Sequence, residues 1–274
     1  SLLCLRCSFE AGQPFLRAVR DAQRLRKGNW MFNSMTGPLR GILFDKDGTL
    51  LDLESLWMPA AEQTIDEALQ RHCGGSVSFR GELLLSVGIS EGRALPESPL
   101  VAGTNEDVAL AIRAVLTRHG VSTEDGFVGE TADFLTRCAC GETANVRPTC
   151  PGLAKILQKL RGRGLVLGLA TSDRPESALR HLQKLGIRQE FEFFGTDDGT
   201  CRPKPAPDLI LTFCKKFGFL PGECAVVGDA PNDMRFAAGA GSVGIFLSPG
   251  GCRELPPGAQ AAVRSLAELP ELLF

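Results

Sequence analysis

Two carboxylates separated by one residue are the most chemically suggestive feature of this sequence. Asp45 and Asp47 follow the apolar run at residues 42–44 and come directly before Gly48 and Thr49. Side chains two residues apart in extended backbone point the same way, so both carboxylates can face one site. Gly48 permits a sharp turn of the backbone. Such a pair suits either a divalent cation, which prefers oxygen ligands, or a nucleophile that works beside a general acid–base.

Polar groups also follow apolar segments further along the chain, where a parallel α/β sheet presents groups to its ligands. Thr171 and Ser172 come directly after the apolar run at residues 165–170. A hydroxyl beside free N–H groups at a helix start binds phosphate well, although Ser172 or Asp173 would serve equally as a plain helix cap. Lys204 stands between two prolines, which stiffen the backbone and hold its ammonium group with little entropy to lose.

A second acidic turn follows the apolar run at residues 225–227. It carries Asp229 and, four residues later, Asp233. Two carboxylates on such a turn can ligate a hard cation, and the plain alternative is a turn followed by an Asp cap. Each of these signals is moderate by itself, and their order along the chain is more informative than any one of them.

In order and setting, these groups resemble the four motifs of the haloacid dehalogenase superfamily. The motifs correspond to DxDGT at Asp45, the strand-ending hydroxyl at Thr171, Lys-Pro at Lys204, and GDxxxD at Asp229. The resemblance covers roughly residues 39–250. It is greatest to phosphoglycolate phosphatase-like members, on the strings Phe-Asp-Lys-Asp-Gly-Thr-Leu and Lys-Pro-Ala-Pro.

The resemblance implies a Mg²⁺-dependent phosphoric monoester hydrolase that acts on a small phosphorylated metabolite, with 2-phosphoglycolate favoured. Asp45 would attack phosphorus and become an aspartyl phosphate. Asp47 would protonate the leaving oxygen and then activate water, since microscopic reversibility allows one group both roles. The phosphate-binding residues implied are Thr171, Ser172 and Lys204, and the magnesium ligands are Asp45, Asp47 (through its main-chain carbonyl), Asp229 and Asp233.

Other members of the superfamily are less compatible with these residues. Dehalogenases generally lack the second carboxylate, so Asp47 argues against that activity. Transporting ATPases carry Thr at that position and need membrane spans. A phosphosugar mutase shares the four motifs and remains an alternative. So does a catalytically inactive module that binds phosphate or a protein.

The elements expected to position these groups divide the chain into three parts. From residue 148 onward apolar strands alternate with amphipathic helices, which predicts a Rossmann-like parallel sheet covered on both sides. Residues 54–147 read as helical, in the place where many members of the superfamily insert a cap domain. We therefore predict a core domain at residues 39–53 and 148–274, a helical cap domain at 54–147, and a poorly ordered extension at 1–38, with Met35 as an alternative start.

Several boundaries follow from capping and turn residues. Ser55 and the pair Ser122 and Asp125 are expected to begin helices, and Thr104 with Asp107 forms a capping-box pattern. Glycine and proline make residues 88–103 a predicted loop. Strands are predicted at 165–170, 191–194, 225–227 and 243–246, and helices at 153–160, 175–185, 205–217, 233–240 and after Ser265.

Composition places few other constraints on function. The net charge is −2 and the hydrophobic content 43%, which provides no electrostatic basis for a nucleic-acid or membrane partner. The ten cysteines are scattered among only three histidines, so free thiols in a reducing cytosol are expected rather than a zinc site. The free thiols predict a cytoplasmic location. We also expect a monomer or homodimer, although composition does not specify the oligomeric state.

Overall fold

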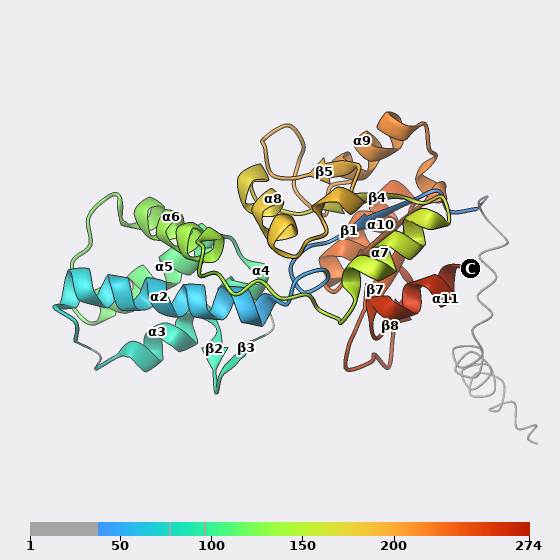
Figure 1. Ribbon diagram of the computed structural model, residues 1–274. Helices are drawn as coiled ribbons and strands as arrows, with labels where there is room; N and C mark the ends of the chain where they lie inside the picture. The colour runs from blue at the N-terminus through green and yellow to red at the C-terminus, as the bar shows by residue number, and fades with distance from the viewer. Residues whose placement is uncertain (1–37, 77, 96) are drawn as a thin grey trace, which may run out of the picture.

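The structure is a computed structural model that describes residues 38–76, 78–95 and 97–274. The extension predicted for residues 1–38 lies outside the described residues, except for Pro38. The described chain forms a sheet unit and a separate group of helices that lie side by side (Figure 1). We call this group, Leu53–Cys140, the helical unit.

The sheet unit is built on six parallel strands. In chain order they are β1 (Gly41–Phe44), β4 (Val166–Ala170), β5 (Phe193–Gly195), β6 (Cys224–Gly228), β7 (Val243–Leu247) and β8 (Ala259–Val263). Their order across the sheet is β5-β4-β1-β6-β7-β8, with every neighbouring pair parallel. Strand β1 therefore lies in the middle, between β4 and β6. This arrangement confirms the predicted Rossmann-like α/β fold.

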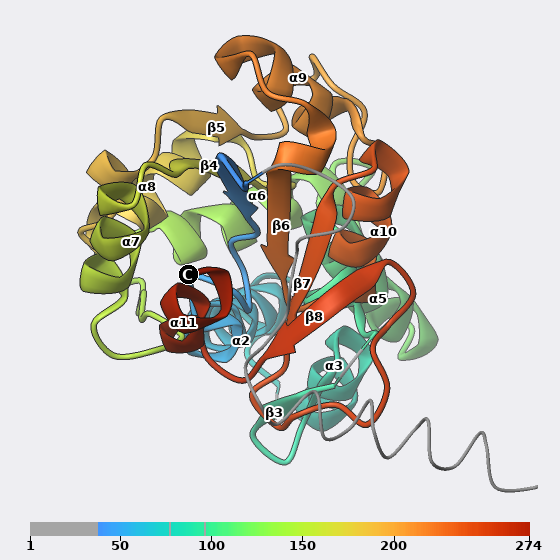
Figure 2. The ribbon, with the colours of Figure 1, turned by 90° about the vertical axis from the view of Figure 1, so that its right-hand side faces the viewer.

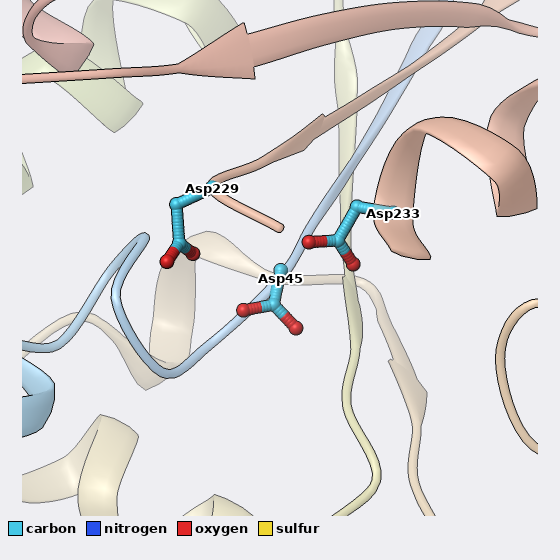
Figure 3. A group of neighbouring side chains, drawn as sticks. All are labelled: Asp45, Asp229 and Asp233. Atoms are coloured by element: carbon cyan, nitrogen blue, oxygen red, sulfur yellow. The ribbon is translucent and has the colours of Figure 1, made fainter. Parts of the chain in front are cut away.

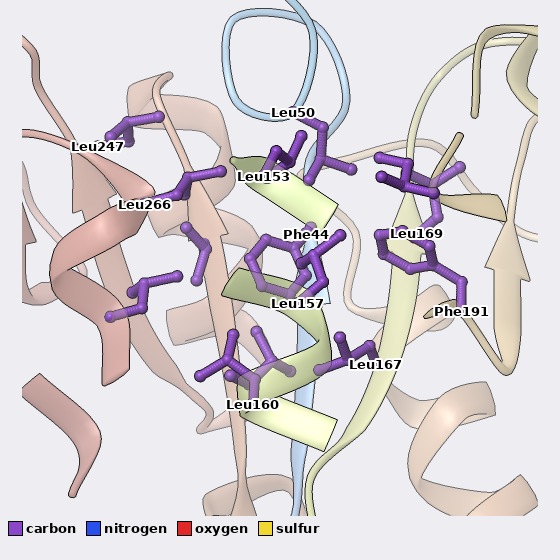
Figure 4. Packing of buried hydrophobic residues seen from close by; sticks show 14 of the residues in the cluster. Phe44, Leu50, Leu153, Leu157, Leu160, Leu167, Leu169, Phe191, Leu247 and Leu266 are labelled. Carbon is purple, nitrogen blue, oxygen red and sulfur yellow. The ribbon is translucent and has the colours of Figure 1, made fainter. Parts of the chain in front are cut away.

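Helices cover both faces of this sheet (Figure 2). On one face, Phe44 packs with Leu157 and meets the ring of Phe191 edge-on at a centroid distance of 6.2 Å (Figure 4). On the opposite face, Leu43 packs with Phe213. Consecutive residues of β1 thus point into two different cores, which is why the strand reads as an uninterrupted apolar run. Helices α7 (Leu153–Gly162), α8 (Pro175–Lys184) and α11 (Leu269–Leu273) cover the first face, and α9 (Asp208–Phe217) and α10 (Pro231–Ala240) the second.

The helical unit packs around an apolar cluster of its own. Its elements are α2 (Leu53–Cys73), α3 (Arg80–Val87), the hairpin β2 (Ile89–Ser90) and β3 (Arg93–Ala94), α4 (Pro99–Ala102), α5 (Asn105–Arg118) and α6 (Phe127–Cys140). The segments that enter and leave the unit run together, because the Asp52 N–H donates to the Arg147 carbonyl at 2.9 Å. Within the described residues, short 3-10 helices also lie at Arg188–Glu190, Pro221–Glu223 and Leu266–Glu268.

Two of the predicted helix starts in this unit were wrong. Helix α2 begins at Leu53, before Ser55, whose hydroxyl instead donates to the carbonyls of Asp52 and Asn145. Helix α6 begins at Phe127 after a turn, with Gly126 rather than Ser122 as its N-cap. The capping box at Thr104 and Asp107 is confirmed, with both reciprocal bonds formed.

Other boundaries differ where short elements carry weak sequence signals. The predicted loop at 88–103 contains the hairpin β2–β3 and helix α4, and α3 and β8 were not predicted. Strand β5 starts only at Phe193, because a 3-10 turn precedes it. Helix α9 starts at Asp208 rather than at 205, since the Asp208 carboxylate accepts bonds from the backbone and side chain of Arg202 and closes the preceding loop.

Candidate active site

Three neighbouring strands deliver the predicted site residues to one edge of the sheet. Asp45 follows β1, Thr171 follows β4 and Asp229 follows β6. Because these strands are parallel and adjacent, their carboxyl ends meet at the point where ligands bind in such sheets. Asp233 comes from the first turn of α10, and Lys204 from the segment between β5 and α9. Residues far apart in sequence are thus gathered in one place.

The carboxylates of Asp45, Asp229 and Asp233 form a compact group, which we call the acidic triad (Figure 3). One oxygen from each lies within 4.8 Å of the others. Hydrogen bonds from neighbouring groups orient two of the three carboxylates. Thr49 donates to Oδ1 of Asp229 at 2.7 Å, and the Ala230 N–H donates to Oδ2 of Asp233 at 3.2 Å. Such a cluster of carboxylate oxygens matches the ligand preference of a hard divalent cation.

Lys204 supplies the positive charge beside this triad. Its ammonium group contacts Oδ1 of Asp45 and lies 2.7 Å from Oδ1 of Asp233. The Lys204 side chain is only 5% exposed. Burial by itself lowers the pKa of this ammonium, but the carboxylates of Asp233 and Asp45 outweigh it and raise the pKa overall. Lys204 therefore stays charged next to Asp45.

Two carboxylates of the triad, Asp45 and Asp229, resist ionisation. Burial raises the pKa of Asp45 well above its usual value, and the charges of Asp233 and Asp229 add to this effect against the opposing Lys204. Burial likewise raises the pKa of Asp229 to about 6, with the Thr49 hydrogen bond acting in the opposite direction. Raised pKa values of clustered, buried carboxylates are typical of a site that binds a cation or a proton.

The side chain of Asp47 takes a different direction from the triad. Its carboxylate accepts from the Lys46 ammonium at 2.7 Å and from the Trp57 indole N–H at 2.8 Å. Burial opposes its charge, but Lys46 and the Trp57 hydrogen bond together lower the pKa of Asp47. No sequence pattern indicated a role for Lys46 or Trp57. Lys46 occupies the variable position of the motif, and nothing local in the sequence indicates that its side chain is fully buried.

The hydroxyl groups after β4 are placed differently from each other. Thr171 is 4% exposed, and its hydroxyl accepts from the Asp173 N–H at 3.2 Å. Ser172 is exposed. Within the described residues, helix α8 has Arg174 as its N-cap and no side-chain hydrogen bond at that cap. The plain reading of Ser172 or Asp173 as a helix cap is therefore wrong.

Two other arginines lie at the surface. Arg202 pairs with Asp208 at 2.8 Å on the surface, and Arg93 is exposed on β3 of the hairpin. The described cysteines are free thiols, as expected. Cys4 and Cys7 lie outside the described residues. Across the part of the chain that the structure describes, no helix has the length and apolarity needed to cross a membrane.

Comparison with known families agrees with this site. The family model of haloacid dehalogenase-like hydrolases matches residues 39–241, which include every member of the triad and Lys204. The chain belongs to this family. The match includes the whole helical unit and most of the sheet unit of this hydrolase.

Among curated relatives, the hydrolase is 25% identical to a phosphoglycolate phosphatase of Chromobacterium violaceum, over 86% of this chain and 96% of that protein. It is 26% identical to the phosphoglycolate phosphatase of Escherichia coli O157:H7, over 77% and 82% of the two chains. The crystal structure of a haloacid dehalogenase phosphatase from Thermococcus onnurineus superposes with a TM-score of 0.58 at 25% identity, over 86% of this chain and 98% of that one. The hydrolase is thus a phosphoglycolate phosphatase-like member of its family.

Proposed function

We propose that this hydrolase is a Mg²⁺-dependent phosphatase that cleaves a small phosphorylated metabolite, with 2-phosphoglycolate the favoured substrate. The observation that carries this proposal is the acidic triad, with the ammonium of Lys204 against Asp45. A phosphate ester needs positive charge around its oxygens and a nucleophile aligned with phosphorus. The relatives named as phosphoglycolate phosphatases support the substrate class.

The residues present fit Mg²⁺ as the resident cation. The triad offers carboxylate oxygens within reach of one small ion, and the main-chain carbonyl of Asp47 follows two residues after Asp45 in the same turn. When bound, Mg²⁺ neutralises charge between the phosphate and the carboxylates. The proposed ligands are Asp45, Asp47 through its carbonyl, Asp229 and Asp233.

The remaining roles follow from position. Asp45, at the end of the central strand, is the proposed nucleophile and becomes the aspartyl phosphate. Asp47 protonates the leaving oxygen and then takes a proton from the attacking water. Lys204, Thr171 and Ser172 hold the phosphoryl oxygens, over which charge is spread during transfer. Lys204 contacts Asp45 directly, so it also keeps that carboxylate turned toward the site.

We also propose that the helical unit, together with the segment that follows it, forms the cap of this enzyme. The proposed core domain is residues 39–53 and 148–274, and the proposed cap domain is residues 54–147. The unit has its own apolar cluster and joins the sheet unit through adjoining segments at Asp52 and Arg147. Its Trp57 contacts Asp47 beside the triad. Movement on these two segments would exclude water during transfer and select the leaving group.

A substrate screen tests the proposed function. Purified protein is incubated with phosphorylated metabolites, including 2-phosphoglycolate, sugar phosphates and nucleotides, and released inorganic phosphate is measured with Mg²⁺ and after EDTA treatment. We expect Mg²⁺-dependent release that EDTA abolishes and Asp45→Asn removes. Full activity after exhaustive EDTA treatment would contradict the proposal. Conversion of a sugar phosphate to its isomer without phosphate release would identify a mutase instead.

Acid quench and mass spectrometry then test the roles of the two carboxylates. During turnover of an activated aryl phosphate, the parent enzyme is expected to carry phosphate on Asp45. Asp47→Asn should still transfer some phosphate and hydrolyse the intermediate slowly, because a good leaving group needs less acid assistance. Phosphate on any other residue of the parent would overturn the assignment of the nucleophile.

A further inference from the structure

A buried ammonium group lies at the boundary between the sheet unit and the helical unit. Lys46 has a fully buried side chain, and its Nζ has three polar partners. It lies 2.7 Å from the Asp47 carboxylate, 3.1 Å from Oδ2 of Asp173 and 3.2 Å from Nδ1 of His181. An ammonium group has three N–H donors and no acceptor. The three partners therefore use its full donor capacity and fix the direction of each bond.

The geometry also determines the state of His181. Its Nδ1 must accept from Lys46, so the proton of the neutral ring is on Nε2. That Nε2 lies 3.0 Å from the Ala139 carbonyl in α6 and donates to it. Burial and the neighbouring Lys46 charge both lower the pKa of His181, which keeps the ring neutral. His181 is itself fully buried. One imidazole thus connects Lys46 in the sheet unit with the backbone of the helical unit.

We propose that His181 is a positioning residue for Asp47, acting through Lys46. Without an acceptor at Nδ1, one N–H of a buried Lys46 would lose its partner, and an unsatisfied buried donor is costly. The ammonium would then move to find another acceptor, and the Asp47 carboxylate would move with it. This inference rests on the phosphatase function proposed above, because it concerns the group that serves the leaving oxygen.

The rest of the network explains why one histidine can have this effect. Ser177 donates to Asp173 at 2.9 Å, and the Cys140 thiol donates to Ser177 at 3.2 Å. Asp173 is therefore held by Ser177 as well as by Lys46. His181, by contrast, is the partner that links Lys46 to the main chain of α6. At the other side, Trp57 of α2 donates to Asp47. Asp47 is thereby linked to two helices of the helical unit.

Two aryl phosphates with different leaving groups test the proposal. Phenyl phosphate has a poor leaving group that needs acid assistance, whereas 4-nitrophenyl phosphate has a good one that needs little. The measured quantity is kcat/KM, which reports the steps up to phosphoryl transfer to Asp45. Misplacement of Asp47 lowers kcat/KM for phenyl phosphate more strongly. A general loss of structure lowers both values by the same factor.

The two variants differ in whether they keep a hydrogen-bond acceptor at the position of His181 Nδ1. His181→Phe removes both ring nitrogens, and His181→Asn places an amide oxygen near the position of Nδ1, where it accepts from Lys46. We expect His181→Phe to lower kcat/KM for phenyl phosphate at least about tenfold more than for 4-nitrophenyl phosphate, within the range of general acid catalysis. His181→Asn should restore most of the parent ratio. The Mg²⁺ concentration for half-maximal activity should remain unchanged in both variants.

Controls separate this inference from the proposed function and from misfolding. His119→Phe replaces a histidine on the helical unit that contacts Glu82, and it should leave both kcat/KM values unchanged. If His181→Phe does not fold, His181→Gln is used in its place. The Gln side chain is longer than that of Asn, so its amide extends past the position of Nδ1 and does not replace the acceptor for Lys46. Equal losses for the two substrates, or failure of His181→Asn to differ from the other variant, would overturn the inference. No turnover by the parent enzyme would instead reject the proposed phosphatase.

Discussion

The hydroxyl of Thr49 donates a hydrogen bond of 2.7 Å to Oδ1 of Asp229. This bond joins the turn after β1 to the loop after β6, although the two residues are distant in sequence. It favours the ionised form of Asp229, whose pKa burial raises to about 6. A hydroxyl in the first motif thus orients a carboxylate of the fourth.

Thr49→Val should weaken Mg²⁺ binding. Loss of a hydrogen bond to a charged group costs about 1.5–3 kcal/mol, and about 1.4 kcal/mol is a tenfold change in affinity. We therefore expect the Mg²⁺ concentration for half-maximal activity to rise about tenfold or more. Thr64→Val is the matched control, because Thr64 is buried in the helical unit and donates to the Ala60 carbonyl. An unchanged Mg²⁺ requirement in Thr49→Val would show that this bond does not support the metal site.

Stabilisation by Mg²⁺ should depend on pH. Without metal, the pKa of Asp229 is raised from 3.8 to about 6. Between these values the unfolded chain has released the proton that the folded chain retains, so stability falls as the pH rises. A bound cation removes this penalty by favouring the carboxylate. The increase in Tm on adding Mg²⁺ should therefore be larger near about pH 8 than near about pH 5, where protons compete for the site.

Calorimetry with Mg²⁺ and with EDTA at several pH values measures this dependence. Asp229→Asn is the comparison variant, because the Asn amide does not titrate in this pH range. This substitution should remove most of the increase in Tm caused by Mg²⁺. An equal Tm increase at both ends of the pH range would argue against titration of Asp229 during metal binding.

Gly48→Ala should disrupt the metal site. Gly48 has φ +80, and a Cβ there would overlap the carboxylate of Asp229. Gly152 has φ +73, but nothing lies within 4 Å of a Cβ at that position. Both substitutions therefore carry the backbone strain of about 1–2 kcal/mol for a side chain in the left-handed region. Only Gly48→Ala also displaces Asp229.

Thermal unfolding and Mg²⁺ titration distinguish the two effects. Gly152→Ala should lose stability and keep the parent's Mg²⁺ requirement, whereas Gly48→Ala should lose both stability and Mg²⁺-dependent turnover. If the two variants show the same Mg²⁺ requirement, close approach to Asp229 is not the reason for glycine at position 48.

Removal of the helical unit should affect selectivity more than folding of the sheet unit. The N–H of Asp52 donates to the carbonyl of Arg147 at 2.9 Å, so a short Gly-Ser linker can replace residues 54–146. The two apolar clusters of the sheet unit consist of residues outside this segment. We expect a folded protein with weak activity on aryl phosphates and a flattened ranking of metabolites. Retention of the parent's substrate ranking would show that the specificity element lies elsewhere.

Much of the site followed from local sequence patterns. An apolar run such as residues 42–44 specifies a buried strand, because it packs on both faces of the sheet. The resemblance to the family motifs singled out Asp45, Asp229 and Asp233, and the structure brings these three carboxylates together. The short element β8 was not predicted, because Ala259–Val263 consists mainly of small residues with one glutamine and lies at the sheet edge.

The sequence by itself indicated the parallel fold, through apolar strands that alternate with amphipathic helices. The resemblance of its four short motifs to a known family indicated the family and the residues of the acidic triad. Tertiary structure alone decided the partners of Lys46. It packs against His181 and Asp173, which are contributed by α8 and by the loop before it. A lysine in a motif looks the same in sequence whether it is solvated or buried. Its environment is set by elements that pack against it from elsewhere in the chain, and no local pattern encodes that contact.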